Sequence, residues 1–191
     1  MFNDKTQTAE YLYSKIKSKK KHAKEYKSKL FDKTKYSVES GIQIDYEEND
    51  IYIQYIARNI TENLENPTRK EIAEAVYTWV ETNVEYEYPS YYESKYYASQ
   101  TAKLKRGNCC DQARLIIALC RAAGIPRHAT EYYHSECVEL RNGKIVGHVW
   151  PVITLEDDEK IVCDTTCCGG SFGSPSWKNL GCAEHSIFLS F

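Results

Sequence analysis

One segment of the chain, residues 107–126, constrains its fold more than any other. A polar turn at Gly107 and Asn108 leads into two cysteines, and an apolar run of helical type then continues as far as Gly124 and Pro126. Glycine is favoured just after a helix and proline cannot continue one, so this pair marks where the helix stops. The segment therefore predicts a helix that begins at a cysteine thiol.

The apolar pattern has a different period on the two sides of this helix. Before it, residues 51–64 and 69–83 place apolar side chains three and four residues apart, which is typical of amphipathic helices. After it, residues 127–140, 144–155 and 160–165 favour strands, and an Asn-Gly pair between the first two indicates a tight hairpin. Helices first and an antiparallel sheet second define an α+β fold.

The segments outside this core are polar. Residues 8–30 contain neither Gly nor Pro and suit one exposed helix, whereas residues 167–191 favour loops that end in a short strand at 187–191. We therefore interpret residues 1–49 as a basic helical N-terminal extension and residues 50–191 as the domain that carries the chemistry.

Composition is that of a globular protein with one main domain. The 191 residues are 42% hydrophobic and 27% charged with a formal net charge of −2, so the overall charge indicates no nucleic-acid partner. Residues 1–40 hold 11 Lys and Arg against five acidic residues, a pattern that favours a solvated helix face over contact with an anionic surface. No apolar run approaches the roughly 20 residues that cross a bilayer, and the first residues lack a secretory signal. We expect a monomer that is made in the cytoplasm.

The cysteine count favours free thiols. An even number of cysteines would suggest disulfides in a secreted chain, but this chain shows no signal and is long enough to build its own core. The eight stand at positions 109, 110, 120, 137, 163, 167, 168 and 182. One or two disulfides in the C-terminal part remain an alternative, and so does a tetrahedral zinc site, although the spacing is not that of paired zinc knuckles. The candidate zinc ligands are Cys163, Cys167, Cys168, Cys182 and His185.

The start of the central helix is where a reactive thiol is expected. Backbone N–H groups of the first turn and the positive end of the helix dipole favour a thiolate there. Cys109 and Cys110 compete for the role of nucleophile. Cys109 lies in the turn just before the helix, where its sulfur can face a groove. Cys110 is about a hundred degrees further round and points more naturally into the core, so the position favours Cys109.

His148 and Asp164 provide the other parts of a cysteine–histidine–aspartate device. Cysteine chemistry on an amide needs a thiolate, a base that later protonates the leaving amine, and a group that orients the base. The two residues lie on successive predicted strands, and a turn centred on Glu156 would put them opposite each other. If the turn is centred on Asp157, Trp150 takes the place opposite Asp164 and the histidine still points to the same face. A turn centred between two residues would separate them onto opposite faces.

Residues 84–103 are dense in tyrosine and contain Pro89, which together indicate a loop. A tyrosine combines a large apolar ring with a polar tip and suits a substrate groove, and packing of a long loop onto the body explains it equally well. The predicted substrate-binding residues are Tyr91, Tyr92, Tyr96, Tyr97 and, two residues after the histidine, Trp150.

Three blocks of the sequence together resemble the catalytic blocks of the transglutaminase-like superfamily. They are Gly107-Asn108-Cys109-Cys110-Asp111 with the helix that follows it, then Gly147-His148-Val149-Trp150, and then Cys163-Asp164-Thr165-Thr166. More narrowly, the first two blocks are similar to those of archaeal viral pseudomurein endoisopeptidases. The resemblance covers about residues 50–190.

This resemblance implies a papain-like α+β fold with N-terminal helices packed on an antiparallel sheet. It implies Cys109 as the nucleophile, His148 as base and acid, and Asp164 as the orienting carboxylate. The implied enzyme is a thiol endoisopeptidase that hydrolyses the lysine-linked crosslink of pseudomurein and lyses methanogen cells, acting on the wall after release from an archaeal host. The chemistry requires a reduced thiol and no metal or other cofactor, with a role for a divalent cation left open.

Other functions fit parts of the same pattern. Acyl transfer to an amine and peptidase action on another crosslink use the same three groups, and the exclusion of water decides between hydrolysis and transfer. A wall-binding or zinc-binding module is the non-enzymatic alternative, and the presence of all three catalytic groups disfavours it.

Overall fold

The computed structural model describes residues 46–88, 95–166, 170–180 and 185–186. The helix predicted over 8–30 and the strand predicted over 187–191 lie outside the described residues. The chain divides into two compact units. Unit 1 comprises Met1–Ile44, His134–His148 and Trp177–Phe191, and unit 2 comprises Asp45–Tyr133 and Val149–Ser176.

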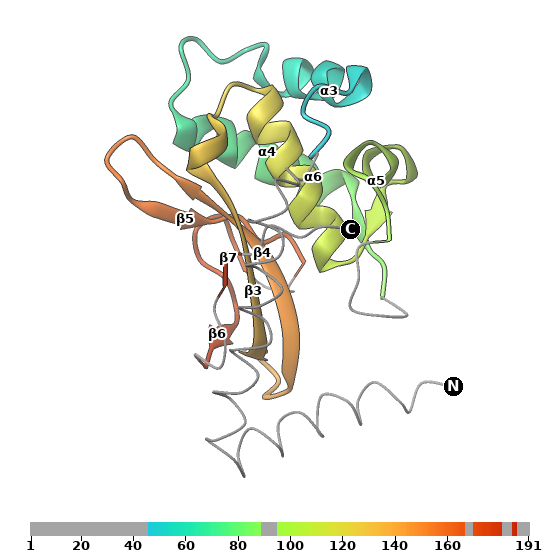
Figure 1. Cartoon of the computed structure of the whole chain (residues 1–191), viewed down its shortest axis with the longest axis vertical. Helices are drawn as coiled ribbons and strands as arrows, with labels where there is room; N and C mark the ends of the chain where they lie inside the picture. The colour runs from blue at the N-terminus through green and yellow to red at the C-terminus, as the bar shows by residue number, and fades with distance from the viewer. Residues whose placement is uncertain (1–45, 89–94, 167–169, 181–184, 187–191) are drawn as a thin grey trace, which may run out of the picture. The chain divides into compact units, whose positions relative to one another are not determined.

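Unit 2 is built around one buried helix, α6 (Cys109–Ala122), which is the helix predicted from the cysteine segment. Within α6, all residues from Cys109 to Cys120 are buried, because the helix contacts several other helices (Figure 1). These are α3 (Ile51–Thr61), α4 (Arg69–Asn83) and α5 (Ala98–Leu104). After α6 the chain turns at Gly124, whose φ of +107° lies in the region that only glycine adopts readily.

Helix α5 lies in the segment that the sequence predicted as a tyrosine-rich loop, so that prediction is wrong for its second half. Gln100 Oε1 accepts a hydrogen bond from the backbone N–H of Tyr97 at 3.0 Å, so the N–H of the residue that precedes the helix has a partner. Ala98 and Ala102 are buried one turn apart. A helix this short shows too few apolar positions for a periodic signal, and its stability comes from packing.

Residues 46–48 pack against the C-terminal end of α6. The guanidinium of Arg121 lies 4.4 Å from the ring centre of Tyr46, and burial raises the pKa of Tyr46 to about 12. The buried carboxylate of Glu48 forms ion pairs with Arg121 at 3.9 Å and with Arg127 at 2.5 Å. These contacts attach the chain entering α3 to the central helix.

The strands form two sheets. β1 (Glu85–Tyr86) pairs in parallel with β2 (Arg106–Gly107), directly before α6. The larger sheet has the order β5-β4-β3-β6, and β7 also pairs with β3. Its strands are β3 (Thr130–Glu139), β4 (Ile145–Thr154), β5 (Lys160–Val162), β6 (Lys178–Asn179) and β7 (His185–Ser186). The predicted α+β fold, with helices packed on an antiparallel sheet, is confirmed.

Within unit 1, the predicted hairpin joins β3 to β4. Leu140 and Lys144 are joined by a backbone hydrogen bond of 2.8 Å, and Gly143 takes the left-handed conformation with a φ of +78°. β6 and β7 lie in the segment predicted as loop. β6 is held on β3 by the register Val138↔Asn179 and by a 2.9 Å hydrogen bond from Leu180 N to Cys137 O.

Within unit 2, the turn between β4 and β5 sets the register that the sequence left open. Val152 pairs with Val162 and Thr154 with Lys160, so the turn is centred on Asp157. The left-handed conformation of Asp158, with a φ of +67°, and a 2.8 Å hydrogen bond from Leu155 N to Glu159 O close it.

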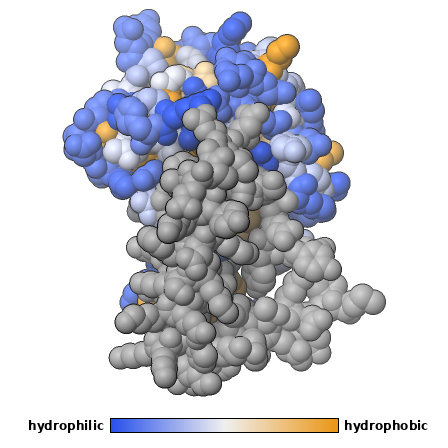
Figure 2. All heavy atoms as spheres, viewed as in Figure 1, coloured by the Kyte–Doolittle hydropathy of each residue, from blue (hydrophilic) through white to orange (hydrophobic). Residues whose placement is uncertain are grey.

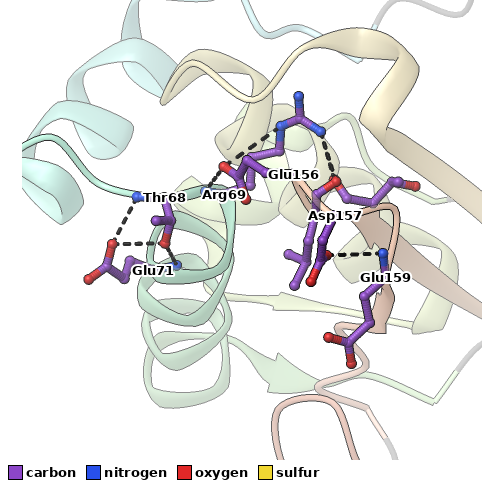
Figure 3. Close-up of polar contacts among 8 residues, drawn as sticks. Thr68, Arg69, Glu71, Glu156, Asp157 and Glu159 are labelled. Carbon is purple, nitrogen blue, oxygen red and sulfur yellow. Dashed lines mark hydrogen bonds and ion pairs between the residues drawn. The ribbon is translucent and has the colours of Figure 1, made fainter.

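The start of α4 contacts this turn (Figure 3). Thr68 and Glu71 form a capping box, in which each side chain accepts from the other residue's backbone N–H. Next to it, the backbone N–H of Arg69 donates to Glu156 Oε1 at 2.8 Å, and its guanidinium donates to the Thr154 and Leu155 carbonyl oxygens at 3.2 and 3.1 Å. These bonds attach the helical part of unit 2 to the β4–β5 hairpin.

On the face drawn in Figure 2, the described residues are mostly hydrophilic and the hydrophobic ones are scattered. Within the part of the chain that the structure describes, no helix has the length and apolarity to span a bilayer.

Candidate active site

The start of α6 is held by reciprocal hydrogen bonds between Asn108 and Asp111. The Asn108 side chain accepts from the N–H groups of Cys110 and Asp111 at 2.8 and 3.1 Å, and Asp111 Oδ2 accepts from Asn108 N at 3.1 Å. Cys109 is the first residue of the helix, one position further in than the sequence predicted. Its thiol therefore lies in the first turn, where the positive end of the helix dipole acts.

Gly107 is required by the packing of this turn. A Cβ atom at this position would lie 2.7 Å from Asp111 Cβ and 3.1 Å from Thr101 Cγ2. Both neighbours are buried, and neither atom is the far end of a flexible side chain. The sequence showed Gly107 only as part of a polar turn, because close approach between segments leaves no local pattern.

The two adjacent thiols have different surroundings. Cys109 is 9% exposed, whereas Cys110 is 4% exposed and interacts with the hydroxyl of Tyr132 on β3. A hydrogen bond with Cys109 lowers the pKa of Cys110 below its usual value, and Tyr132 adds to this effect while burial opposes it. The two thiols are neighbours at the start of the helix, and the lowered pKa of Cys110 does not identify which of them attacks a substrate. The choice of Cys109 as nucleophile stays a prediction.

Asp164 follows β5 in unit 2 and is 5% exposed. The pairing of Val152 with Val162 continues as far as Cys163, whose N–H donates to Pro151 O at 2.9 Å, and Asp164 is the next residue. This register is that of a turn centred on Asp157. The next residue, Thr165, donates to a side-chain oxygen of α6, so the segment lies against the helix that begins with the thiol pair.

His148 is the last residue of its stretch of unit 1 and is 5% exposed. Its ring meets that of Trp177 edge to face, with ring centres 5.5 Å apart. His148 and Trp150 lie two residues apart on β4, so the pleat directs both side chains to the same face of that strand. The thiol pair and the carboxylate belong to unit 2 and the imidazole to unit 1.

The predicted substrate-binding residues differ in how they are placed. Tyr91 and Tyr92 lie outside the described residues. Tyr97 is 53% exposed and covers the guanidinium of Arg114 on α6 at 4.7 Å, and Tyr96 is half-buried. Trp150 is 3% exposed and stacks on Tyr133 with ring centres 6.1 Å apart, so in this structure its ring is part of the packed interior. Their contact with substrate stays a prediction.

Asp111 also holds the chain that enters α5. Its Oδ1 accepts from the backbone N–H groups of Lys95 and Tyr96 at 2.7 and 2.9 Å, while Oδ2 accepts from Asn108. This buried carboxylate thus joins the approach to α5 and the turn before Cys109. The Asn-x-x-Asp spacing at a helix start is a recognisable capping signal, but nothing local in the sequence indicates the bonds from Asp111 to the approach to α5.

Asp111→Asn is expected to lower the free energy of unfolding by about 1–3 kcal/mol. An asparagine can accept from Lys95 and Tyr96 only by turning its NH₂ group toward the Asn108 N–H, which leaves two donors facing each other. Chemical denaturation measures the effect. Asp157→Asn is the matched control, since its Oδ1 accepts a single backbone N–H in an exposed turn. Equal stability of the two variants would contradict this role for Asp111.

The cysteines of the described residues fall into two groups. Cys109, Cys110, Cys120 and Cys163 are free thiols, as predicted. Cys137 is disulfide-bonded, so the prediction of free thiols is wrong for this residue. Within the described ranges no three His, Cys, Asp or Glu side chains gather as a metal site would require. The zinc alternative falls mostly on residues outside those ranges.

A shallow groove of about 570 Å³ lies on a different part of unit 2, between α3 and α4. Half-buried Ile60, Leu64 and Trp79 form its apolar part, and the carboxylates of Glu71 and Glu74 lie at its rim. None of its lining residues belongs to the start of α6 or to the segment after β5.

An α+β fold with a cysteine at the start of its buried central helix is the arrangement of papain-like and transglutaminase-like proteins. Residues 54–165 match the model of the transglutaminase-like superfamily, which is more than half of the chain. The chain belongs to this superfamily. The match includes Cys109, His148 and Asp164.

Among solved structures, the chain is similar to a candidate cysteine protease from Cytophaga hutchinsonii, with a TM-score of 0.54 and 24% identity over 72% of this chain. It spans only 45% of the length of that protein. Legionella pneumophila LapG matches with a TM-score of 0.48 and 16% identity, over 67% of this chain and 80% of that one. A candidate protease from Parabacteroides distasonis matches at 0.46 and 15%, over 75% and 28%. Comparison with curated proteins finds no match. The first similarity confirms the fold.

Proposed function

We propose that this chain is a cysteine peptidase with Cys109 as nucleophile, His148 as base and acid, and Asp164 as the group that orients the imidazole. One observation carries the proposal. The segment with Asp164 is hydrogen-bonded to α6 one turn after its first residue, so the carboxylate belongs to the same part of unit 2 as the thiol pair. Membership of the transglutaminase-like superfamily supports the same assignment.

The proposed reaction has two stages. The Cys109 thiolate attacks the carbonyl carbon of the scissile amide, and backbone N–H groups at the start of α6 stabilise the oxyanion. His148, as imidazolium, gives its proton to the leaving amine while the C–N bond breaks, which leaves a thioester. The neutral imidazole then takes a proton from water, the hydroxide attacks the thioester, and the acid and the free thiolate are released. Asp164 keeps the imidazole in the tautomer that this sequence of transfers requires.

For the substrate, we propose the isopeptide bond through a lysine side chain that crosslinks pseudomurein. The support is the resemblance of the Gly-Asn-Cys-Cys-Asp and Gly-His-Val-Trp blocks to pseudomurein endoisopeptidases. The wall of a methanogen would then be the partner, reached after release from the host cell, and the enzyme would act as a monomer. The proposed chemistry needs a reduced thiol and routes no step through a metal.

Mass spectrometry of methanogen wall fragments tests this proposal. Incubation with the chain should release peptides that carry a new free lysine ε-amine, and Cys109→Ala should release none. A labelled primary amine added to the same reaction separates hydrolysis from transfer, because transfer would attach the label to the acyl product. If the wall fragments stay unchanged while another crosslinked peptide is cleaved, the proposed substrate is wrong and the assignment as a cysteine peptidase stands.

A further inference from the structure

A buried glutamine of α6 connects the segment after β5 to the start of the helix. Gln112 is 1% exposed. Its Oε1 accepts from Thr165 Oγ1 at 2.7 Å, and its Nε2 donates to Gly107 O at 3.0 Å and to Glu85 O at 3.4 Å. Only one orientation of the amide satisfies these partners, because the NH₂ group cannot accept and the carbonyl oxygen cannot donate. Gln112 therefore links β1, β2 and the segment after β5.

Thr166 holds one oxygen of the Asp164 carboxylate. The backbone N–H of Thr166 donates to Asp164 Oδ1 at 3.0 Å, and its hydroxyl donates to the same oxygen at 2.7 Å. Two donors on one oxygen restrict the rotation of the carboxylate group. Asp164 is 5% exposed, so little water competes for these bonds.

We propose that Gln112 and Thr166 are positioning residues for the carboxylate that orients the catalytic imidazole. Gln112 sets how closely the Asp164 segment lies to the nucleophile helix, and Thr166 sets the direction of the carboxylate. The inference rests on the proposed function, in which Asp164 holds the base. Neither residue touches the substrate in this scheme, and each acts through Asp164.

The expected effects follow from what an orienting carboxylate does. Its hydrogen bond to the imidazole stabilises the imidazolium, and the imidazolium in turn keeps the cysteine as a thiolate near neutral pH. Loss of the Thr166 hydroxyl removes a hydrogen bond to a charged group, an effect of about tenfold. A misdirected carboxylate should therefore slow the chemical step and move the titration of the thiol to higher pH, with little change in KM.

The direct test compares Thr166→Val with Thr166→Ser. The first removes the hydroxyl at nearly constant shape, and the second keeps it. We expect the valine variant to alkylate at Cys109 with iodoacetamide about tenfold more slowly at pH 7, with a midpoint of the pH profile shifted upward, and to lose kcat by a similar factor. The serine variant should stay within about twofold of the wild type. Thr61→Val is the matched control, because its hydroxyl donates to Ala57 O on α3.

Gln112→Met is the second test, because methionine fills similar space without either polar group. The Thr165 hydroxyl loses its partner, and we expect the pH profile to shift in the same direction as for Thr166→Val. If either variant is unfolded by circular dichroism, Thr166→Ala compared with Thr166→Ser tests the same hydroxyl. A pH profile and kcat equal to wild type in the folded valine or alanine variant would overturn the inference.

Failure of this inference is distinguishable from failure of the proposed function. If His148→Ala and Asp164→Asn both change the alkylation profile of Cys109 while the Thr166 and Gln112 variants do not, the triad stands and the positioning residues are wrong. If His148→Ala and Asp164→Asn leave the profile unchanged, the triad itself is wrong, and the positioning role is overturned with it.

Discussion

Cys109→Ala is expected to abolish cleavage, with a loss of about 10⁴-fold or more in kcat, because removal of a nucleophile leaves only binding and oxyanion stabilisation. The fold should persist, since the change removes one sulfur atom from the end of a helix that is held by the Asn108–Asp111 capping box. Cleavage assays and thermal unfolding, run on the same preparation, measure the two outcomes separately.

Cys110→Ala is the matched control for this prediction. Cys110 faces Tyr132 in the interior, so its loss should lower stability slightly and leave cleavage within about tenfold of the wild type. The reverse result, with cleavage retained by Cys109→Ala and lost by Cys110→Ala, would exchange the two roles. Chemical labelling gives a second check. Burial raises the pKa of Cys120 to about 12 and that of Cys163 well above its usual value, so neither should react at neutral pH.

His148→Ala is expected to have the second largest effect, a loss of about 10²–10⁴-fold in kcat, because the leaving amine then departs without its proton donor. It should also remove rapid alkylation of Cys109 at pH 7. In the proposed triad, an imidazolium beside the thiol would favour the thiolate below the ordinary cysteine pKa of about 8.5, so we expect the rate of alkylation in the wild type to be high already at pH 7. Without the imidazolium, the rate should rise only as the pH approaches that ordinary value.

Asp164→Asn tests the third member of the triad in the same assay. Asparagine fills the same space and still accepts from Thr166, but its amide no longer stabilises an imidazolium by charge. The alkylation profile should therefore move to higher pH, in the same direction as for His148→Ala. His128→Ala, an exposed histidine in unit 2, serves as the control. Identical profiles for His148→Ala and His128→Ala would argue against a thiolate–imidazolium pair.

Much of the fold could be predicted because its signals are local. The helix from Cys109 to Ala122 was readable from its capping turn, its apolar run and the Gly-x-Pro stop, all within twenty residues. The hairpin between β3 and β4 was readable from one Asn-Gly pair. Helix α5 and the short strands β6 and β7 were not, because a few residues give no periodicity, and packing or pairing with distant segments decides their structure.

The candidate site divides in the same way. Cys109, His148 and Asp164 could be proposed from residue types, predicted elements and family resemblance. The roles of Gln112 and Asp111 could not, because their partners stand far away in the chain. Gln112 and Thr165 are 53 residues apart, and Asp111 and Lys95 are 16 apart. A polar residue in a helix carries no mark of which distant group it bonds.

The amino-acid sequence by itself determined that a cysteine begins a buried helix and that an antiparallel hairpin follows. It also predicted a histidine and an aspartate on successive strands, but β5 ends at Val162 and Asp164 lies just after it. These features depend on side-chain periodicity and on the conformations that glycine, proline and asparagine favour, which act over a few residues. Only the tertiary structure decided that the β4–β5 turn is centred on Asp157 and that Gln112 holds the Asp164 segment on α6. Strand register and buried hydrogen bonds depend on which distant groups meet. The local sequence pattern of each strand is the same whether the strand pairs in this register or in one shifted by a residue, so the pattern does not decide between them.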